Sequence, residues 1–389
     1  MQKSIIIGLA FVLLAGFSYG TVVGHYEVFP FEILSLTKQI ISGSDQNISE
    51  DRLQISQKIS KISEHITINN FEDIQQKRKQ LIEYIWVNES FPSNKLPQSF
   101  QQNIIDPIFS DMVNLSQIDS FTVVMDYGMD STSYLFIPKE SNNKLVIFHQ
   151  GRATQANSDP NSHTFNRDKE IIQNFLNHNY AVLIFSMVGK GMNNEPIIEL
   201  ERFGTVTLNS HNHFELLESE NFHPIKFFIE PVIITLNQVE KNYLFNSISM
   251  VGLSQGGGWS AVVIPAIDPR ITESYSVAGS FPIWMSSSPS NFGDYEQTIP
   301  EFYKIANYEE LYIMGAYGEG RKLVLFYNEF DPCCFSGHIY KQFPFKTIIQ
   351  ERLKILEGEF DVIIDEGQDK HVISDFTLNQ IFSSLESKL

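Results

Sequence analysis

The chain has 389 residues, of which 42% are hydrophobic, 13% aromatic and 19% charged, and its formal net charge is −18. This length and apolar content suffice for one large domain with an appendage or for two smaller ones. The negative charge argues against nucleic acid or an anionic lipid surface as a partner, and the aromatic content excludes a largely disordered chain.

The N-terminal segment is predicted to carry the chain across a membrane. Lys3 precedes an uncharged, mostly apolar run from Ser4 to Gly24. At about 1.5 Å per residue, this run is long enough for a bilayer core of roughly 30 Å. We expect residues 1–24 to stay as an uncleaved anchor with the rest of the chain outside the cytoplasm. The alternative is a signal peptide cleaved before Thr21, and no other membrane contact is expected.

Residues 25–117 are predicted to form a helical extension without chemistry of its own. From Ser49 to Trp86, Ile and Leu recur at three- and four-residue steps, which predicts two helices, the second beginning near Asn70. Two prolines in "NESFPSNKLPQSF" then break the helical pattern.

From residue 118 to the end, predicted strands alternate with predicted helices. "IDSFTVVMDYG" and "TSYLFIPKE" predict two strands at an antiparallel edge, joined by a turn at Tyr127–Asp130. Further strands are predicted at "KLVIFHQG", "YAVLIFS", "SISMVGL", "ESYSVAG", "KLVLFYN" and "FDVIIDE". Helices are predicted between them at about 168–177, within 224–243, from 254 to 266, near 345–356 and from 374 onward. This alternation predicts an α/β fold, with a mostly parallel sheet and helices on both faces, over residues 118–389.

Ser254 in "SMVGLSQGGGW" lies between a predicted buried strand and a predicted helix. Gly252 and Gly256 lie two residues to either side, where larger side chains would collide in a sharp strand-to-helix turn. Such a turn exposes the serine hydroxyl above the sheet, next to the free N–H groups of the helix N-terminus. We therefore predict that Ser254 is a nucleophile. The alternative is a strand end that is flexible because of its glycines and has no catalytic role.

A nucleophilic serine needs a base, and the base needs an orienting carboxylate. Asp331 follows the strand "KLVLFYN", and His371 lies between the last strand and the last helix. This order of Ser, Asp and His along the chain is one that strand-end catalytic residues adopt. Pro332 ends the strand and fixes the loop, which favours Asp331 as the carboxylate. The alternative carboxylates are Glu329, Asp365 and Asp369.

Two backbone N–H groups are expected to form an oxyanion hole, each contributing roughly 2.7–4 kcal/mol to the transition state. One is the amide of Gln255. The other is expected in the loop after "LVIFHQGR", at Gly151 or Arg152, because glycine lets the backbone approach closely. His149 is expected to support this loop without transferring a proton.

The segments "HQG", "GLSQGG", "FDPCC" and "KHVIS" together resemble the α/β-hydrolase superfamily. The stretch "GLSQGGGWSAVVIPAIDPRITESYSVAG" is similar to exported hydrolases near the acetylxylan esterase, dienelactone hydrolase and S9 peptidase branches. The resemblance covers about residue 118 to the end. It implies the α/β-hydrolase fold with an eight-stranded sheet, and catalytic roles for Ser254, Asp331 and His371. Gln150 departs from the pattern, because many esterases have glycine directly after this histidine.

Two segments that lack the hydrophobic periodicity of a helix or a strand are expected beside the site. Residues 191–224 are predicted to form a lid or insertion, and 279–297 a second pocket wall whose aromatic residues suit an apolar or ring-bearing group. Ordinary loop packing is the alternative for the second segment. A zinc site is the alternative for the histidines of the first, because a His-x-His pair can bind zinc. These histidines are His211, His213 and His223. No metal and no organic cofactor is expected.

Cys333 and Cys334 are the only cysteines and are adjacent. Export favours a disulfide between them, two residues beyond Asp331. The alternatives are two buried thiols and a zinc site shared with His338.

The sequence thus predicts an exported serine hydrolase that cleaves a small-molecule carboxylic ester or acyl substrate through an acyl-enzyme. An S9-like serine peptidase is the first alternative, although the N-terminal region is too short and too helical for a propeller domain. The second alternative is a catalytically silent binding protein on the same fold.

Overall fold

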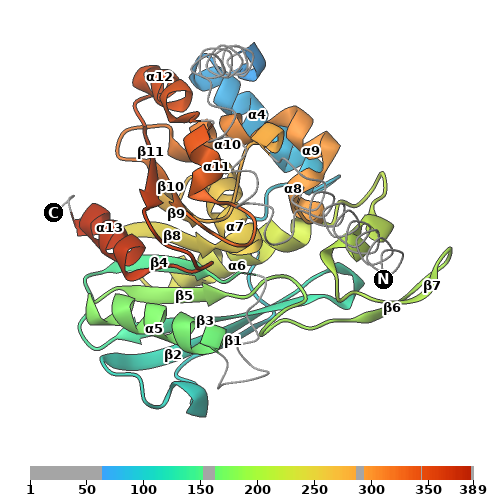
Figure 1. Cartoon of the computed structure of the whole chain (residues 1–389). Coiled ribbons are helices and arrows are strands. Elements are labelled where there is room, and N and C mark those ends of the chain that lie inside the picture. The colour runs from blue at the N-terminus through green and yellow to red at the C-terminus, as the bar shows by residue number, and fades with distance from the viewer. Residues whose placement is uncertain (1–63, 152–162, 286–292, 343, 387–389) are drawn as a thin grey trace, which may run out of the picture. The chain divides into compact units, whose positions relative to one another are not determined.

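A computed structural model describes residues 64–151, 163–285, 293–342 and 344–386 (Figure 1). The predicted anchor at residues 1–24 and nearly all of the first predicted helix lie outside these residues. None of the helices in the described ranges is both long enough and apolar enough to cross a membrane.

A nine-stranded sheet forms the centre of the described chain, in the order β1-β2-β3-β5-β4-β8-β9-β10-β11. Its strands are β1 (Ser99–Gln101), β2 (Leu115–Val124), β3 (Asp130–Pro138), β4 (Lys144–His149), β5 (Ala181–Phe185), β8 (Ser247–Leu253), β9 (Ile271–Val277), β10 (Lys322–Asn328) and β11 (Glu359–Asp365). The pairs β1/β2, β2/β3 and β3/β5 are antiparallel, and the strands from β5 to β11 run parallel. The mostly parallel sheet with one antiparallel edge therefore has the predicted form.

The strand β1 is an addition to the eight strands that the sequence predicts. It has three residues and pairs antiparallel with β2, where the rings of Phe100 and Phe121 stack with centroids 5.0 Å apart. Its brevity and the two prolines before it explain why no alternating pattern marks it in the sequence.

Helices cover both faces of the sheet (Figure 1). The α-helices are α4 (Phe71–Ile85), α5 (His163–Asn177), α6 (Lys226–Asn242), α7 (Ser254–Ile267), α8 (Tyr295–Thr298), α9 (Pro300–Ile305), α10 (Tyr308–Ala316), α11 (Gly337–Gln342), α12 (Lys346–Leu356) and α13 (Asp375–Glu386). Short 3-10 turns are η1 (Pro107–Phe109), η2 (Asp126–Gly128), η3 (His211–Leu217) and η4 (Ile283–Met285). The helices α8 to α11 are findings of the structure that the sequence analysis does not predict.

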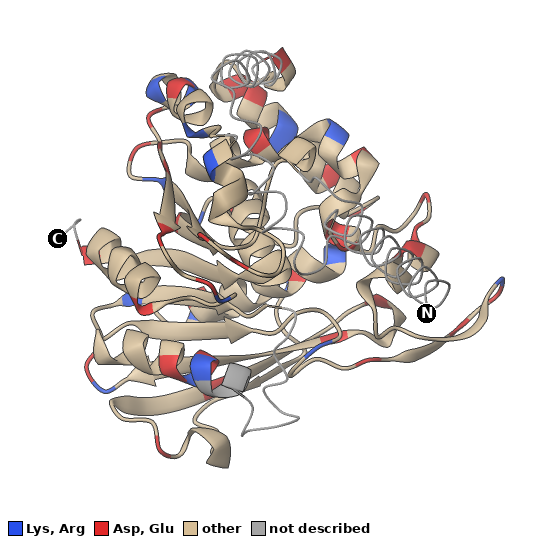
Figure 2. Cartoon of the chain, viewed as in Figure 1, with Lys and Arg blue, Asp and Glu red and all other residues tan. Residues whose placement is uncertain are grey.

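Two hydrophobic layers pack against the sheet, one on each face. Along β4, Leu145 and Ile147 belong to one layer and Val146 and Phe148 to the other, as the two-residue period of a strand requires. The layer with Phe148 contains the buried side chains of α5 and α13. The layer with Ile147 contains those of α4, α6, α7, α10 and α12. Figure 2 shows that charged residues lie mainly on the outer helices and loops, so the central strands can be buried on both faces.

The helix predicted near Asn70 is α4, and it packs on the same core as the strands. The Asn70 side chain accepts a hydrogen bond from the Asp73 N–H, and the Asp73 carboxylate accepts one from the Asn70 N–H, forming a capping box. Farther along, Arg78 Nε donates to the Ala266 carbonyl at 2.9 Å, which fastens α4 to the end of α7.

Residues 191–224 contain a two-stranded antiparallel hairpin, β6 (Ile197–Leu200) with β7 (Gly204–Thr207), followed by η3. The hairpin projects away from the central sheet (Figure 1), and its side chains are exposed or half-buried. The turn η3 instead is tied into the core, because His211, Phe214 and Leu217 are buried. The predicted insertion therefore combines an outer hairpin with an anchored turn.

Candidate active site

The three predicted catalytic residues follow parallel strands of one sheet. Ser254 follows β8, Asp331 comes three residues after β10, and His371 comes six residues after β11. The strands β8, β9, β10 and β11 are consecutive neighbours. Because parallel strands end at the same edge of a sheet, the loops that carry these residues start from one edge.

Ser254 occupies a strained turn between β8 and α7. Its φ is +67°, in the left-handed region that a residue with a side chain adopts only at a cost of about 1–3 kcal/mol. The turn excludes side chains at the glycines beside it. A Cβ on Gly252 would lie 1.8 Å from the Gly257 carbonyl oxygen, and a Cβ on Gly256 would lie 2.0 Å from the sulfur of Met187. The glycines around the serine are therefore a steric requirement of this turn.

Asp331 and His371 are in direct contact. His371 Nδ1 lies 2.7 Å from Asp331 Oδ2, and the Asp331 side chain has no exposed surface. The other carboxylate oxygen, Oδ1, accepts a hydrogen bond from the Cys333 N–H at 2.8 Å. A carboxylate on Nδ1 orients the imidazole and leaves the Nε2 lone pair for a proton.

His371 Nε2 is buried and has no hydrogen-bond partner in the described part of the chain. Within the same residues, no hydrogen bond joins it to Ser254 Oγ. The structure thus brings Asp331 and His371 together and places Ser254 at the same sheet edge without a direct bond. In enzymes without substrate, the bond between nucleophile and base is often long or absent.

The alternative carboxylates have other partners. Glu329 is paired with Lys341 and accepts a hydrogen bond from the Gly367 N–H at 2.8 Å. Asp365 accepts a hydrogen bond from the Ser374 hydroxyl. Asp369 is exposed. Asp331 is therefore the carboxylate that orients His371.

Asn328, at the end of β10, holds the loop of His371 and was missed by the sequence analysis. Its Nδ2 donates to the carbonyls of Lys370 and Val372 at 2.8 and 2.9 Å, on either side of His371. Arg167 Nε donates to the next carbonyl, of Ile373, at 3.1 Å. Asn328 could have been found from the sequence, because it is an amide residue at the end of an apolar strand. Nothing local marks Arg167, whose partner lies 206 residues away.

Gly151 lies directly against the turn between β8 and α7 that holds Ser254. A Cβ on Gly151 would lie 2.8 Å from Ser254 Cβ and 3.0 Å from the Leu253 carbonyl oxygen. Only glycine therefore fits at this position. Gln255 is the second residue of α7, so its N–H belongs to the first helical turn and has no intrahelical acceptor. Arg152, the other predicted donor of the loop, lies outside the described residues.

Gln150 supports this loop from inside the protein. Its side chain is buried, with Oε1 accepting from the Ser186 hydroxyl at 2.9 Å and Nε2 donating to Asp168 Oδ2 at 3.1 Å. Gln150, which stands where many esterases have glycine, thus provides a buried amide that holds the loop in place. His149 is also buried, and burial lowers its pKa to about 4, so it is neutral and supports the loop without acting as a base at neutral pH.

We expect Asp168→Asn to stabilise the protein at alkaline pH. Burial raises the pKa of Asp168 from 3.8 to about 8. Between these values the folded state keeps a proton that the unfolded state releases, so stability falls as the pH rises and levels off above the folded pKa. Asparagine keeps an acceptor for Gln150 and removes this loss. Melting curves from pH 5 to pH 9 should show the advantage of the variant over the wild type growing steadily up to about pH 8, to several degrees, and then staying constant.

The exposed acid Asp375, which pairs with the neighbouring Arg167, supplies the matched control. Asp375→Asn should not change the slope of the melting temperature with pH. If the difference in melting temperature between Asp168→Asn and the wild type is the same at every pH, Asp168 is ionised in the folded protein and the expectation is wrong.

Cys333 and Cys334 are joined by a disulfide, the arrangement favoured by the sequence analysis. The disulfide lies next to Asp331, because the Cys333 N–H donates to its carboxylate. We expect a mild reductant to slow turnover severalfold while the circular dichroism of the protein stays unchanged, because the loop that holds Asp331 loosens before the core. The measurement is the rate of the hydrolysis that the sequence predicts, before and after reduction, with free thiols counted in each sample.

The double variant Cys333→Ser, Cys334→Ser is the control, and it should be slow from the start and insensitive to reductant. A reduced wild-type sample with two free thiols and an undiminished rate would show that the disulfide does not support Asp331.

The second predicted pocket wall is only partly described. Phe281 is buried against Tyr327 and Phe335, with ring centroids 4.8 and 5.4 Å away, and Trp284 Nε1 donates to Glu309 at 2.6 Å. These two aromatic residues are therefore engaged in internal packing, and residues 286–292 lie outside the described part. Gln297, which the sequence analysis missed, donates from Nε2 to the Gln255 carbonyl at 2.9 Å and so supports the turn that holds Ser254.

The three histidines of the predicted insertion have separate partners. His213 Nδ1 lies 2.9 Å from the Thr207 carbonyl, and His223 Nδ1 lies 2.7 Å from a Glu218 carboxylate oxygen. His211 is buried and contacts Glu296 at 3.1 Å. The His-x-His pair therefore does not converge on one point.

No family model matches the chain, and no curated protein matches its sequence. Among solved structures, the fold is similar to acetyl xylan esterase 1 from Thermoanaerobacterium sp. JW/SL YS485, with a TM-score of 0.50 and 12% identity over 83% of this chain and 96% of that one. It is also similar to the acetyl xylan esterase from Paenibacillus sp. R4, with a TM-score of 0.50 and 13% identity over 84% and 98%. These proteins have the α/β-hydrolase fold, and the present chain has the same fold.

Proposed function

We propose that this chain, an α/β-hydrolase by its fold, is a serine hydrolase that cleaves carboxylic esters. One observation carries the proposal: a carboxylate-oriented histidine with a buried, unpartnered Nε2 lies at the sheet edge where a serine is held at positive φ. A histidine that only filled space would have no need of a buried carboxylate on Nδ1 and an unused nitrogen on the other side. The similarity to two esterase structures supports the same reaction class.

In the first half of the proposed reaction, Ser254 Oγ attacks the ester carbonyl carbon while His371 Nε2 takes the hydroxyl proton. The bond between the carbonyl carbon and the alkoxy oxygen then breaks, and Nε2–H returns the proton to the leaving alcohol. Asp331 stabilises the imidazolium that forms between these steps. In the second half, water attacks the acyl carbon and gives a proton to His371 Nε2. The bond from this carbon to Oγ then breaks, Nε2–H returns the proton to Oγ, and the acid leaves.

The oxyanion of each tetrahedral intermediate is assigned to two backbone amides. The Gln255 N–H lies at the start of α7, where the helix dipole favours negative charge. Gly151 supplies the second donor, since its backbone is close enough to Ser254 to exclude any Cβ. Gln297 and Gln150 hold these two segments from behind through their side-chain amides.

The proposed substrate is a small ester with a short acyl group. The two esterases of similar fold are named for acetyl groups on xylan, which supports an acetyl-sized acyl moiety here. The rate of hydrolysis should decrease in the order p-nitrophenyl acetate, butyrate and octanoate. A matched panel of peptide p-nitroanilides should not be cleaved.

A fluorophosphonate probe tests the serine mechanism independently of the substrate. Only an activated serine reacts with it, so peptide mapping should find the label on Ser254. A folded protein that takes no label and hydrolyses no ester would contradict the proposal and support a silent binding protein. Cleavage of the peptides at rates above those of the esters would identify a peptidase.

A further inference from the structure

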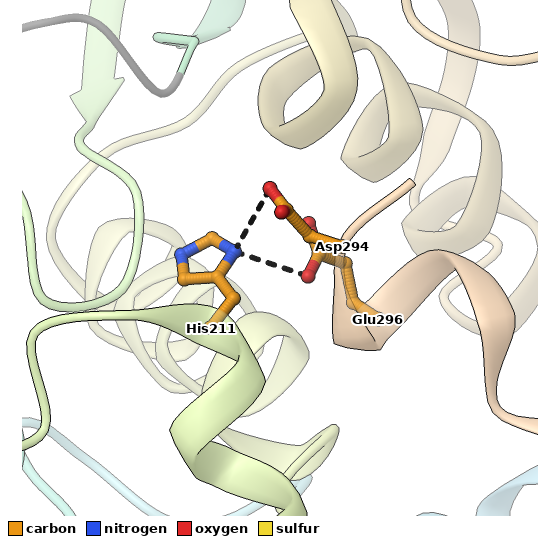
Figure 3. A group of neighbouring side chains, drawn as sticks. All are labelled: His211, Asp294 and Glu296. Carbon is orange, nitrogen blue, oxygen red and sulfur yellow. Dashed lines mark hydrogen bonds and ion pairs between the residues drawn. The ribbon is translucent and has the colours of Figure 1, made fainter. Parts of the chain in front are cut away.

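A second cluster of buried ionisable side chains joins residues 191–224, the predicted insertion, to residues 279–297, the predicted pocket wall (Figure 3). His211 begins η3, Asp294 caps α8 and Glu296 lies in the first turn of α8. His211 Nδ1 lies 3.1 Å from Glu296 Oε2 and 3.7 Å from Asp294 Oδ2, and the three side chains are 2%, 0% and 10% exposed in the order His211, Glu296, Asp294. One nitrogen and two carboxylate oxygens therefore converge inside the protein.

The orientation of His211 is fixed by its other nitrogen. Nε2 lies 3.2 Å from the Val188 carbonyl oxygen, which can only accept, so Nε2 carries a hydrogen. Nδ1 then points at two carboxylates, as Figure 3 shows. A bare Nδ1 lone pair would repel these oxygens, so a cation must lie between them. Histidine ligands of metals usually donate their second N–H to a backbone carbonyl in this way.

Charge decides between a proton and a metal as that cation. Two carboxylates with a protonated imidazole carry a net charge of −1, whereas two carboxylates, a neutral imidazole and a divalent cation are neutral. A net charge inside a protein has a desolvation cost of several kcal/mol. Within the described residues, Glu296 forms an ion pair with His211 alone. The divalent cation therefore fits the cluster better than the proton.

The second oxygen of Glu296 points to the same conclusion. Glu296 Oε1 is buried without a hydrogen-bond partner in the described chain, on a side chain with no exposed surface. Buried carboxylate oxygens are normally satisfied by hydrogen bonds or by a metal ion. A cation next to Oε2 would use the lone pairs of Oε1 as well.

We propose that His211, Asp294 and Glu296 form a binding site for a divalent transition-metal ion, with Zn²⁺ as the best fit. Bonds of about 2.0–2.1 Å in a tetrahedral site place neighbouring ligand atoms about 3.3 Å apart, close to the two distances at Nδ1. An imidazole ligand favours zinc over the oxygen-preferring Mg²⁺ and Ca²⁺. Glu296 Oε1 or a water molecule completes the coordination.

The metal site would have a structural role and would hold the segments around Ser254 in place. It ties η3 to α8, and the next residue of α8, Gln297, donates to the Gln255 carbonyl in the nucleophile turn. On the other side, Val188 follows Met187, whose sulfur fills the space beside Gly256. The metal would brace this turn without touching the reacting atoms. The proposal stands whether or not the reaction is ester hydrolysis.

The test uses the full chain in its oxidised form, so that no free thiol can bind metal. After treatment with a chelator, the protein is titrated with Zn²⁺ and, in parallel, with Co²⁺. We expect about one Zn²⁺ per chain by elemental analysis, Co²⁺ absorption bands of a four-coordinate site, and a rise of the melting temperature with Zn²⁺. Glu296→Gln, which is nearly isosteric, and His211→Ala should lose the metal and the thermal shift.

His213→Ala is the matched control, because His213 lies in the same turn and contacts a carbonyl only. It should bind metal like the wild type. Equal loss in His213→Ala and His211→Ala would place the metal elsewhere. A wild-type protein that binds no stoichiometric Zn²⁺ and gives no Co²⁺ bands would overturn the proposal without any variant, and the cluster would then be a histidinium paired with carboxylates.

Discussion

Ser254→Ala is expected to lower kcat for ester hydrolysis by a factor on the order of 10⁶, because in the proposed mechanism it removes the only atom that forms the acyl-enzyme. The serine is held at φ +67° between β8 and α7, a conformation that alanine tolerates equally well, so the fold should persist. The measurement is kcat and KM for p-nitrophenyl acetate, with circular dichroism as the check on folding. The change should fall on kcat, because the binding surfaces remain.

Ser260→Ala is the matched control in the same helix. Its hydroxyl is buried and has no hydrogen-bond partner in the described chain, so the variant removes a serine oxygen of α7 without touching the site. Its kcat should stay within a factor of a few of the wild type. The double variant Ser254→Ala, His371→Ala should be no slower than Ser254→Ala, because a base has no function without its nucleophile. Wild-type kcat in purified Ser254→Ala would refute the mechanism.

The sheet and the strand-end residues were predictable because their signals are local. Buried parallel strands such as β5, with the sequence AVLIF, are uninterrupted apolar runs, and the nucleophile turn is marked by its glycines. The helix α10 has no such mark, because all nine of its residues are buried and no polar face gives a helical period. Its Asn307–Glu310 capping box was the one signal available in the sequence.

The contacts that position the site were not predictable, because they join residues far apart in the chain. Asn328 reaches carbonyls 42 and 44 residues away, and Gln297 reaches a carbonyl 42 residues away. His211 and Glu296 are 85 residues apart and come from two segments without periodicity. A His-x-His spacing suggested His213 as the partner of His211, whereas the fold supplied carboxylates from the start of α8.

The geometry around Asp331 determines how an amide at this position would behave. Asp331 Oδ1 accepts from the Cys333 N–H and Oδ2 contacts His371 Nδ1. A backbone N–H cannot change from donor to acceptor, so the asparagine of Asp331→Asn must keep its oxygen on Cys333. Its NH₂ group then faces Nδ1 and donates to it. This forces the imidazole hydrogen onto Nε2, where the base needs a lone pair.

Asp331→Asn is therefore expected to lower kcat about 10⁴-fold at neutral pH with little change in KM or in melting temperature. Kinetics with p-nitrophenyl acetate measure the loss, and the ¹⁵N chemical shifts of His371 should show the hydrogen on Nε2 in the variant and on Nδ1 in the wild type. Asp369 is an exposed acid in the same loop as His371, so Asp369→Asn is the control. It should leave kcat and the position of the imidazole hydrogen unchanged. An equal loss in Asp369→Asn, or a wild-type tautomer in Asp331→Asn, would mean that Asp331 does not orient the base. The tautomer distinguishes this role from simple loop support, because a loosened loop would lower kcat without moving the hydrogen.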